Sequence, residues 1–69
     1  NPATEFVNIQ TGGRIATSIK LYDLVGRLIK EITPQASLSV MNISDLPKDI
    51  YQVHINFPGE TVVRRLVVR

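Results

Sequence analysis

The side chains with the greatest potential for chemistry are six carboxylates, one histidine and a group of arginines near the C-terminus. Carboxylates can form an acid/base pair when burial or a neighbouring charge drives their pKa values apart. Five of the six lie beside turns or strand ends, and Glu31 alternates outward from Leu28 and Ile32. We therefore interpret all of them as solvated surface groups. They are Glu5, Asp23, Glu31, Asp45, Asp49 and Glu60.

His54 is the only histidine, and it stands between Gln52 and Asn56 on the polar side of an alternating segment. A catalytic or metal-binding histidine needs an orienting partner, and no neighbour in the sequence provides one. The chain also has no cysteine, which excludes a disulfide, a thiolate metal site and a cysteine nucleophile. We predict no catalytic residue, no metal site and no cofactor, and we interpret His54 as an exposed or half-covered sheet residue.

Arg64, Arg65 and Arg69 lie within the last six residues of a chain whose formal net charge is +2. Basic clusters can bind nucleic acid, but a protein that binds single strands also exposes aromatic rings beside the basic groove. The four aromatic residues are not interleaved with these arginines, and Tyr51 and Phe57 fall on a predicted core face. We therefore predict no nucleic-acid binding. Arginines on a terminal strand can also protect a sheet edge from aggregation.

The apolar residues favour β-strands, because 8 are Val, 8 are Ile and only 3 are Ala. With five Thr, 21 of the 69 residues are β-branched and fit pleated, half-buried strands. Six or seven short apolar segments are separated by turns about every 8 to 12 residues, which is the spacing of a compact sandwich. The sequence thus predicts one all-β domain, an antiparallel β-sandwich of six to seven short strands.

The alternation of apolar and polar residues predicts which side chains face the core. The most regular segment is 51–57, with its apolar side chains on one face and its polar ones on the other. In segment 28–32 the alternation does not decide which face of the strand points toward the core. Phe6 is either covered by a loop or an exposed contact. Arg64 and Arg65 fall on opposite faces of the last strand. The predicted core residues are Val7, Ile9, Ile19, Leu21, Met41, Ile43, Tyr51, Val53, Ile55 and Phe57.

Two glycines mark predicted turns. Gly26 is expected at a positive φ in a short hairpin loop over 24–27. Pro58-Gly59 is typical of a turn with Pro at the first central position and Gly at the second.

The longest apolar run is Leu66–Val68, far shorter than the roughly 20 residues that span a bilayer, so we predict no direct membrane insertion. The chain begins at Asn1 without an initiator methionine, and we expect it to be part of a longer protein.

Several sequence blocks carry a resemblance to a known family. In order, they are residues 1–4 (NPAT), 20–28 (KLYDLVGRL), 43–47 (ISDLP), 50–53 (IYQV) and 61–69 (TVVRRLVVR). Their order and spacing resemble the type IX secretion system C-terminal sorting domain, type A, of the Bacteroidetes, which is also called the Por secretion system sorting domain. The resemblance covers essentially all 69 residues.

The resemblance implies a function as a sorting signal. Such domains are seven-stranded immunoglobulin-like sandwiches at the C-terminus of larger secreted proteins. It implies that residues 1–69 form a single C-terminal domain whose cargo is fused to its N-terminus. It also implies export through the periplasm, recognition by an outer-membrane translocon, delivery to the cell surface or the extracellular space, and removal by a sortase-like protease. The domain would be a substrate and not an enzyme, and an exposed strand edge could also allow a homodimer.

The resemblance also assigns roles to residues. Arg27 could pair with a cross-strand carboxylate such as Asp23 or meet a receptor, and the last strand could be read through edge pairing. The implied recognition residues are Gly26, Arg27, Arg64, Arg65, Leu66, Val67, Val68 and Arg69. The implied structural motif consists of Asp23, Asp45, Leu46, Pro47, Asp49, Tyr51, Pro58 and Gly59.

Within this motif, Leu46 is expected to plug one end of the sandwich and Pro47 to fix φ in its turn. Tyr51 is expected to pack its ring inside, with its hydroxyl at the rim. Asp49 departs from the family pattern, which usually has Gly there. If the position needs a left-handed φ, Asp is among the residues that tolerate it best.

A second interpretation is a non-catalytic immunoglobulin-like module that binds carbohydrate or protein. It is motivated by the predicted sandwich and by the polar strip of Gln52, His54 and Asn56. Only Tyr22 and Phe6 could offer exposed rings for stacking on a sugar.

Overall fold

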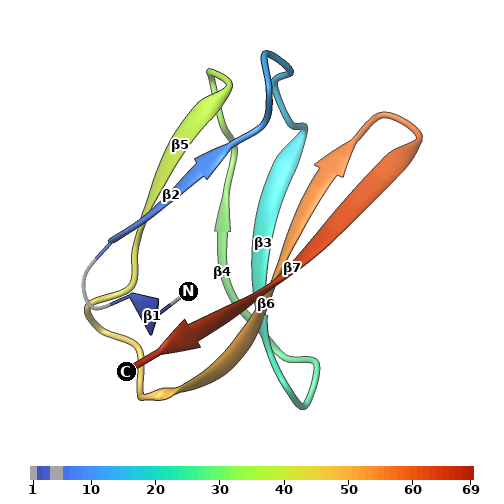
Figure 1. The fold of residues 1–69 in the computed structure, drawn as a ribbon. Coiled ribbons are helices and arrows are strands. Elements are labelled where there is room, and N and C mark those ends of the chain that lie inside the picture. Colours follow the sequence, from blue (N-terminus) through green and yellow to red (C-terminus); the bar gives the residue numbers. More distant parts are fainter. Residues whose placement is uncertain (1, 4–5) are drawn as a thin grey trace.

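The computed structural model describes residues 2–3 and 6–69, and this part of the chain is all-β (Figure 1). The strands are β1 (Pro2–Ala3), β2 (Phe6–Gln10), β3 (Ser18–Asp23), β4 (Leu28–Ile32), β5 (Leu38–Asn42), β6 (Asp49–Phe57) and β7 (Glu60–Val68). No helix capable of crossing a membrane occurs in these residues. Thr4 and Glu5, which belong to the first predicted strand, lie outside the described residues. The all-β prediction is confirmed.

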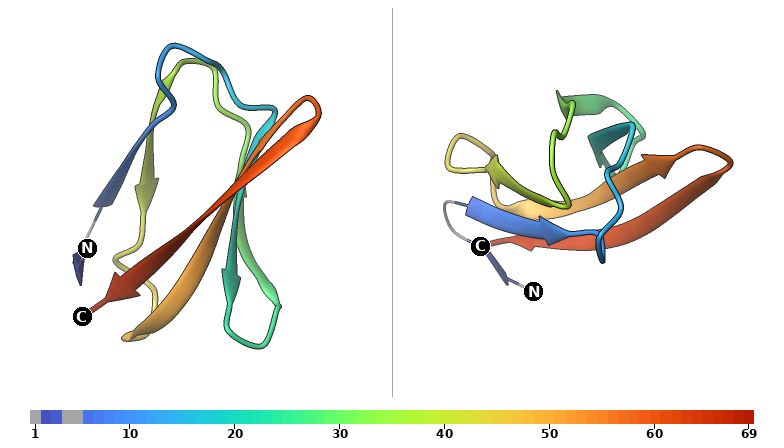
Figure 2. Two further views of the ribbon diagram at one scale, coloured as in Figure 1. Left: turned by 45° about the vertical axis from the view of Figure 1, so that its right-hand side comes forward. Right: turned by 90° about the horizontal axis from the view of Figure 1, so that it is seen from above.

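The strands form two sheets that pack as a sandwich (Figure 2). The larger sheet has the order β1-β7-β6-β3-β4, and the smaller consists of β2 and β5. Among the described strands every pairing is antiparallel except that of β1 with β7, where Pro2 and Ala3 run parallel to Val67 and Val68. The antiparallel sandwich is confirmed. The parallel pairing spans too few residues to leave an alternating pattern in the sequence.

The core lies between the sheets, on the faces that the alternation predicts. Ile19, Leu21, Met41 and Ile43 have at most 1 % of their surface exposed. Four apolar side chains of β6, Tyr51, Val53, Ile55 and Phe57, are buried with them, as is Ile9, and Val7 packs against this cluster. Leu46 packs against the same cluster from the β5–β6 loop, as expected for the residue that closes one end.

The structure shows which face of β4 points toward the core. Ile32 pairs with Ile19 and Lys30 with Leu21, so both lie on the core-facing side of the sheet. The ladder is shifted between Leu21 and Tyr22, which marks a bulge at the end of the β3–β4 hairpin. The other predicted ambiguity, Phe6, is settled as an exposed ring on the outer face of the small sheet.

Candidate functional site

The last strand, β7, carries most of the predicted recognition residues. Arg64 pairs with buried Val53 of β6, which places Arg64 on the core-facing side. Arg65 pairs with Gln52 on the opposite face. The prediction that the two arginines lie on opposite faces is therefore confirmed. A strand that followed strict alternation would carry an apolar residue at position 64.

Exposure divides the predicted recognition residues of this strand into two groups. Leu66 and Val68 are buried members of the core, and Val67 is half-buried. Arg64, Arg65 and Arg69 are exposed, and none of them forms an ion pair with a carboxylate of the described residues. A partner that meets the folded domain can therefore contact the arginine side chains and the strand backbone, but little of the side chains of Leu66 and Val68, which are 3 % and 5 % exposed.

One edge of β7 is open over most of its length. β6 pairs with β7 from Glu60 to Val68, whereas β1 pairs with the other edge only at Val67 and Val68. Among the described residues no strand pairs with that other edge from Glu60 to Leu66. Unpaired N–H and C=O groups on such an edge can accept another strand.

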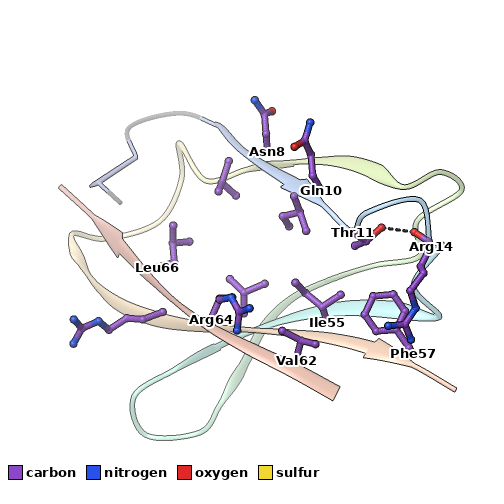
Figure 3. Close-up of a pocket in the computed structure, with 13 residues that line it drawn as sticks. Asn8, Gln10, Thr11, Arg14, Ile55, Phe57, Val62, Arg64 and Leu66 are labelled. Atoms are coloured by element: carbon purple, nitrogen blue, oxygen red, sulfur yellow. Dashed lines mark hydrogen bonds between the residues drawn. The ribbon is translucent and has the colours of Figure 1, made fainter. Parts of the chain in front are cut away.

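A groove of about 400 Å³ lies beside this edge, between β2 and the β6–β7 hairpin (Figure 3). Its lining combines apolar residues such as Ile55, Val62 and Leu66 with polar ones such as Asn8, Gln10 and Thr11. Arg14 and Arg64 also line it, and no carboxylate does so. The groove therefore combines apolar surface with the positive charge of Arg64 and Arg65, since Arg14 is paired with Glu60.

Arg14 closes one end of the groove. Its guanidinium lies over the ring of Phe57, 3.8 Å from the ring centroid, and its Nη1 donates to Glu60 Oε1 at 2.9 Å. The backbone carbonyl of Arg14 accepts a hydrogen bond from the Thr11 hydroxyl (Figure 3). Sequence reasoning missed Arg14, because its partners lie more than 40 residues further along the chain. No local pattern signals such a contact.

The β3–β4 hairpin holds the other two predicted recognition residues. Gly26 has φ +94°, as predicted. The Asp23 carboxylate accepts from the backbone N–H groups of Val25 and Arg27, at 3.0 and 2.9 Å, and from Arg27 Nε at 2.8 Å. The expected pairing of Arg27 with Asp23 is thus confirmed. The Arg27 side chain remains 77 % exposed, so a partner can still contact it.

Asp23 corrects one prediction. We interpreted all six carboxylates as solvated, but the side chain of Asp23 is only 12 % exposed. Three N–H donors replace the lost water, led by the backbone N–H of Arg27, and they lower the pKa of Asp23 below its ordinary value of 3.8. Short-range turn geometry, which the sequence shows only as Asp23 with Gly26-Arg27 three and four residues later, produces this site.

The lowered pKa of Asp23 predicts acid sensitivity. A carboxylate whose pKa is lower in the folded state stabilises the fold above its unfolded pKa and loses that effect as the pH falls through its folded value. We expect the melting temperature to be nearly constant from about pH 7 to pH 5 and to fall below about pH 4. Thermal melts of Asp23→Asn should show a weaker dependence in that range. Glu31→Gln is the control, because Glu31 is exposed and forms no ion pair within the described residues; an equal change in both variants would contradict the assignment.

Gly26 predicts a backbone effect on stability. Alanine at this position should lower the free energy of unfolding by about 1 to 2 kcal/mol, because a Cβ atom strains a positive φ. A Cβ atom there would meet no other atom within 4 Å, so crowding cannot be the cause. Denaturant unfolding provides the measurement. Gly26→Asn is the matched control, since Asn tolerates positive φ better; a loss as large as that of alanine would contradict this explanation.

The β5–β6 loop fixes the end of the sandwich as the structural motif implies. Tyr51 is buried, and its hydroxyl donates to the Pro47 carbonyl at 2.7 Å; burial raises the pKa of this phenol above 10.0. Asp45 pairs with Lys30 of β4 at 2.9 Å, which lowers the pKa of Asp45. Asp49 begins β6 with a negative φ and accepts from the Ile50 N–H, so this chain does not need glycine there.

The two groups of predicted recognition residues lie at the same end of the large sheet but not together. Asp23, at the start of the hairpin turn, pairs with Tyr51, which in turn pairs with Leu66. β6 therefore separates Gly26 and Arg27 from β7 (Figure 1). A partner would have to span β6 to contact both groups.

The polar strip of β6 is occupied by contacts within the sheet. The His54 ring is half-buried, as predicted, and packs against Tyr22 with 4.5 Å between ring centroids. Asn56 bonds to Ser18 and Thr61. This strip and Tyr22 therefore offer little free surface for a sugar, which weakens the interpretation as a carbohydrate-binding module.

The fold and the open edge of β7 define the class of the protein: a small β-sandwich that presents a basic strand edge. The family model described as "Secretion system C-terminal sorting domain" matches residues 1–69. The chain therefore belongs to the family of type IX secretion C-terminal sorting domains. Comparisons with curated proteins and with solved structures found no match.

Membership of this family gives the domain its general function. It is a C-terminal sorting signal for type IX secretion, a role that is not catalytic. Such a signal is attached to a cargo protein, interacts with the secretion machinery and directs export to the cell surface or the extracellular space.

Proposed function

We propose that the secretion machinery recognises the folded domain at β7, through its open edge and through the side chains of Arg64, Arg65 and Arg69. The observation that carries this proposal is that these arginines are exposed beside an edge that has no strand paired with it from Glu60 to Leu66 in the described part of the chain. Arginine binds carboxylates and phosphates through a rigid set of donors, and an open edge adds backbone hydrogen bonds. Arg27 on the hairpin would give a second contact to a partner that spans β6.

The proposal includes the complete route. Residues 1–69 form a single domain at the C-terminus of a larger secreted protein and have no enzymatic activity of their own. The cargo crosses the inner membrane to the periplasm, where an outer-membrane translocon recognises the domain. A sortase-like protease then removes it. The family assignment supports this order of events, and the absence of paired acidic groups among the lining residues of the groove agrees with a binding role.

A fusion experiment tests the function. A reporter with a Sec signal peptide and with residues 1–69 at its C-terminus is expressed in a type IX-competent Bacteroidetes host. We expect the reporter at the cell surface or in the medium, in a mature form shortened by about the mass of the domain. The same reporter without residues 1–69 should remain in the periplasm. Periplasmic retention of both proteins would overturn the proposal.

A further inference from the structure

We propose that the groove between β2 and β7 binds an extended, acidic segment of a partner protein. The segment would add a strand to the free edge of β7 and place a carboxylate against Arg64. This inference rests on the proposed function, since it names the chemistry that the partner presents at the same strand. The experiment below measures binding by the isolated 69-residue chain and does not depend on export.

Arg64 occupies an unusual place for a cation. It lies on the core-facing side of β7, opposite Val53 and between Val62 and Leu66 on the same face. Its Nη1 donates to the Val63 carbonyl at 3.0 Å, and no carboxylate of the described residues forms an ion pair with it. The remaining donors of the guanidinium are therefore available to a carboxylate, which they can bind in a bidentate manner.

The free edge has the length and the precedent for another strand. From Glu60 to Leu66 an extended chain spans roughly 23 Å. At the end of this stretch β1 already pairs with Val67 and Val68, so the edge of β7 accepts a strand within this molecule. A partner segment would continue that pairing along the rest of β7, which is recognition by strand addition.

The side chains beside the edge select the composition of that segment. On the groove side, Val62, Arg64 and Leu66 follow each other at every second position. A complementary strand would therefore carry an apolar residue, a carboxylate and another apolar residue on its inner face, because cross-strand neighbours interact in pairs. Acidic residues are favoured further by Arg65, which also lines the groove and forms no ion pair with a described carboxylate, whereas Arg14 is already paired with Glu60.

Charge argues against a second copy of this chain as the occupant. An added β7 from another molecule would bring its own Arg64 and Arg65 to an edge that already carries these two cations. Like charges on neighbouring strands are destabilising. An inward-pointing charge on an edge strand can also serve solely to prevent edge-to-edge pairing. The ligand distinguishes the two roles of Arg64. If Arg64 binds an acidic strand, binding depends on a carboxylate in that strand, whereas a purely protective charge has no such dependence.

The probe is a capped peptide with the sequence Thr-Val-Thr-Asp-Thr-Val-Thr, whose inner face repeats valine, aspartate and valine. Titration into the isotopically labelled chain is followed by amide chemical shifts. We expect saturable binding with Kd below about 1 mM and with shifts concentrated on β7 and β2. Asparagine in place of aspartate should weaken binding by about ten-fold, through loss of the charge-assisted pair. A third peptide, with proline replacing the threonine on each side of aspartate, keeps the charge but cannot donate to a ladder and should not bind.

Protein variants locate the site. Arg64→Gln should weaken binding of the acidic peptide by about ten-fold and should abolish the preference for aspartate over asparagine. Lys48→Gln removes the same charge from an exposed loop and should change Kd by less than about two-fold. Thermal melts verify that both variants fold.

The inference is overturned by equal binding of the aspartate and asparagine peptides, by undiminished binding of the proline peptide, or by shifts confined to another surface. A dimer of the free chain whose interface is β7 would also overturn it. The proposed function fails on a different result, which is periplasmic retention of the fused reporter.

Discussion

Replacing Arg65 and Arg69 together with glutamine is expected to lower surface display of a fused reporter at least about ten-fold, while the domain stays folded. Both side chains are exposed, so their removal leaves no cavity in the core. Each charge-assisted hydrogen bond to a partner contributes about 1.5 to 3 kcal/mol, and about 1.4 kcal/mol corresponds to a ten-fold change in binding. Arg64 is kept in this variant, so the groove retains its central cation.

The measurement is the fraction of reporter at the surface, with the periplasmic fraction as its complement. The matched control is Lys20→Gln with Lys48→Gln, which removes the same charge from positions outside β7. That variant should be displayed within about two-fold of the parent, because screening limits the effect of remote surface charges. Equal losses in both variants would mean that net charge, and not the C-terminal strand, governs recognition.

Leu21→Ala is expected to lower the free energy of unfolding more than Gly26→Ala does. Leu21 has 0 % of its surface exposed and lies between the two sheets. Removing a fully buried leucine side chain costs about 2 to 5 kcal/mol through lost burial and the cavity that remains. A domain of this size has a thin margin of stability, so a substantial part of the population should unfold near physiological temperature.

Circular dichroism melts and amide proton exchange measure this loss directly. Leu24→Ala is the matched control, since Leu24 is 60 % exposed at the tip of the β3–β4 hairpin to which Leu21 also belongs. It should change the free energy of unfolding by less than about 0.5 kcal/mol. A loss of similar size in both variants would show that Leu21 does not anchor the core.

Most of the fold could be predicted from the sequence because alternation reports burial directly. Val53 and Ile55 are buried for the same reason that Gln52 is exposed, namely the two-residue period of a strand. The two-residue period did not predict an orientation where contacts between distant parts of the chain decide it. Lys30 lies on the core-facing side and pairs with Asp45 of the β5–β6 loop, and no local pattern encodes that pair.

The candidate site was less predictable than the fold. The opposite orientations of Arg64 and Arg65 follow from alternation, but the groove does not, because it depends on how β2 crosses above β7 (Figure 3). Burial also divided residues that the sequence had grouped: Leu66 is core, whereas Arg65 is surface. Such a division requires the packing of two sheets, which a single strand pattern cannot specify.

The parallel pairing of β1 with β7 has a mechanical consequence. Because the two strands point in the same direction, tension on the chain that precedes β1, resisted by a partner that grips the end of β7, acts along both strands. The hydrogen bonds between Pro2–Ala3 and Val67–Val68 are then loaded in shear and share the force, whereas an antiparallel hairpin pulled at its open end would separate one pair at a time. A short parallel pairing of this kind resists tension along the strands more than tension perpendicular to them.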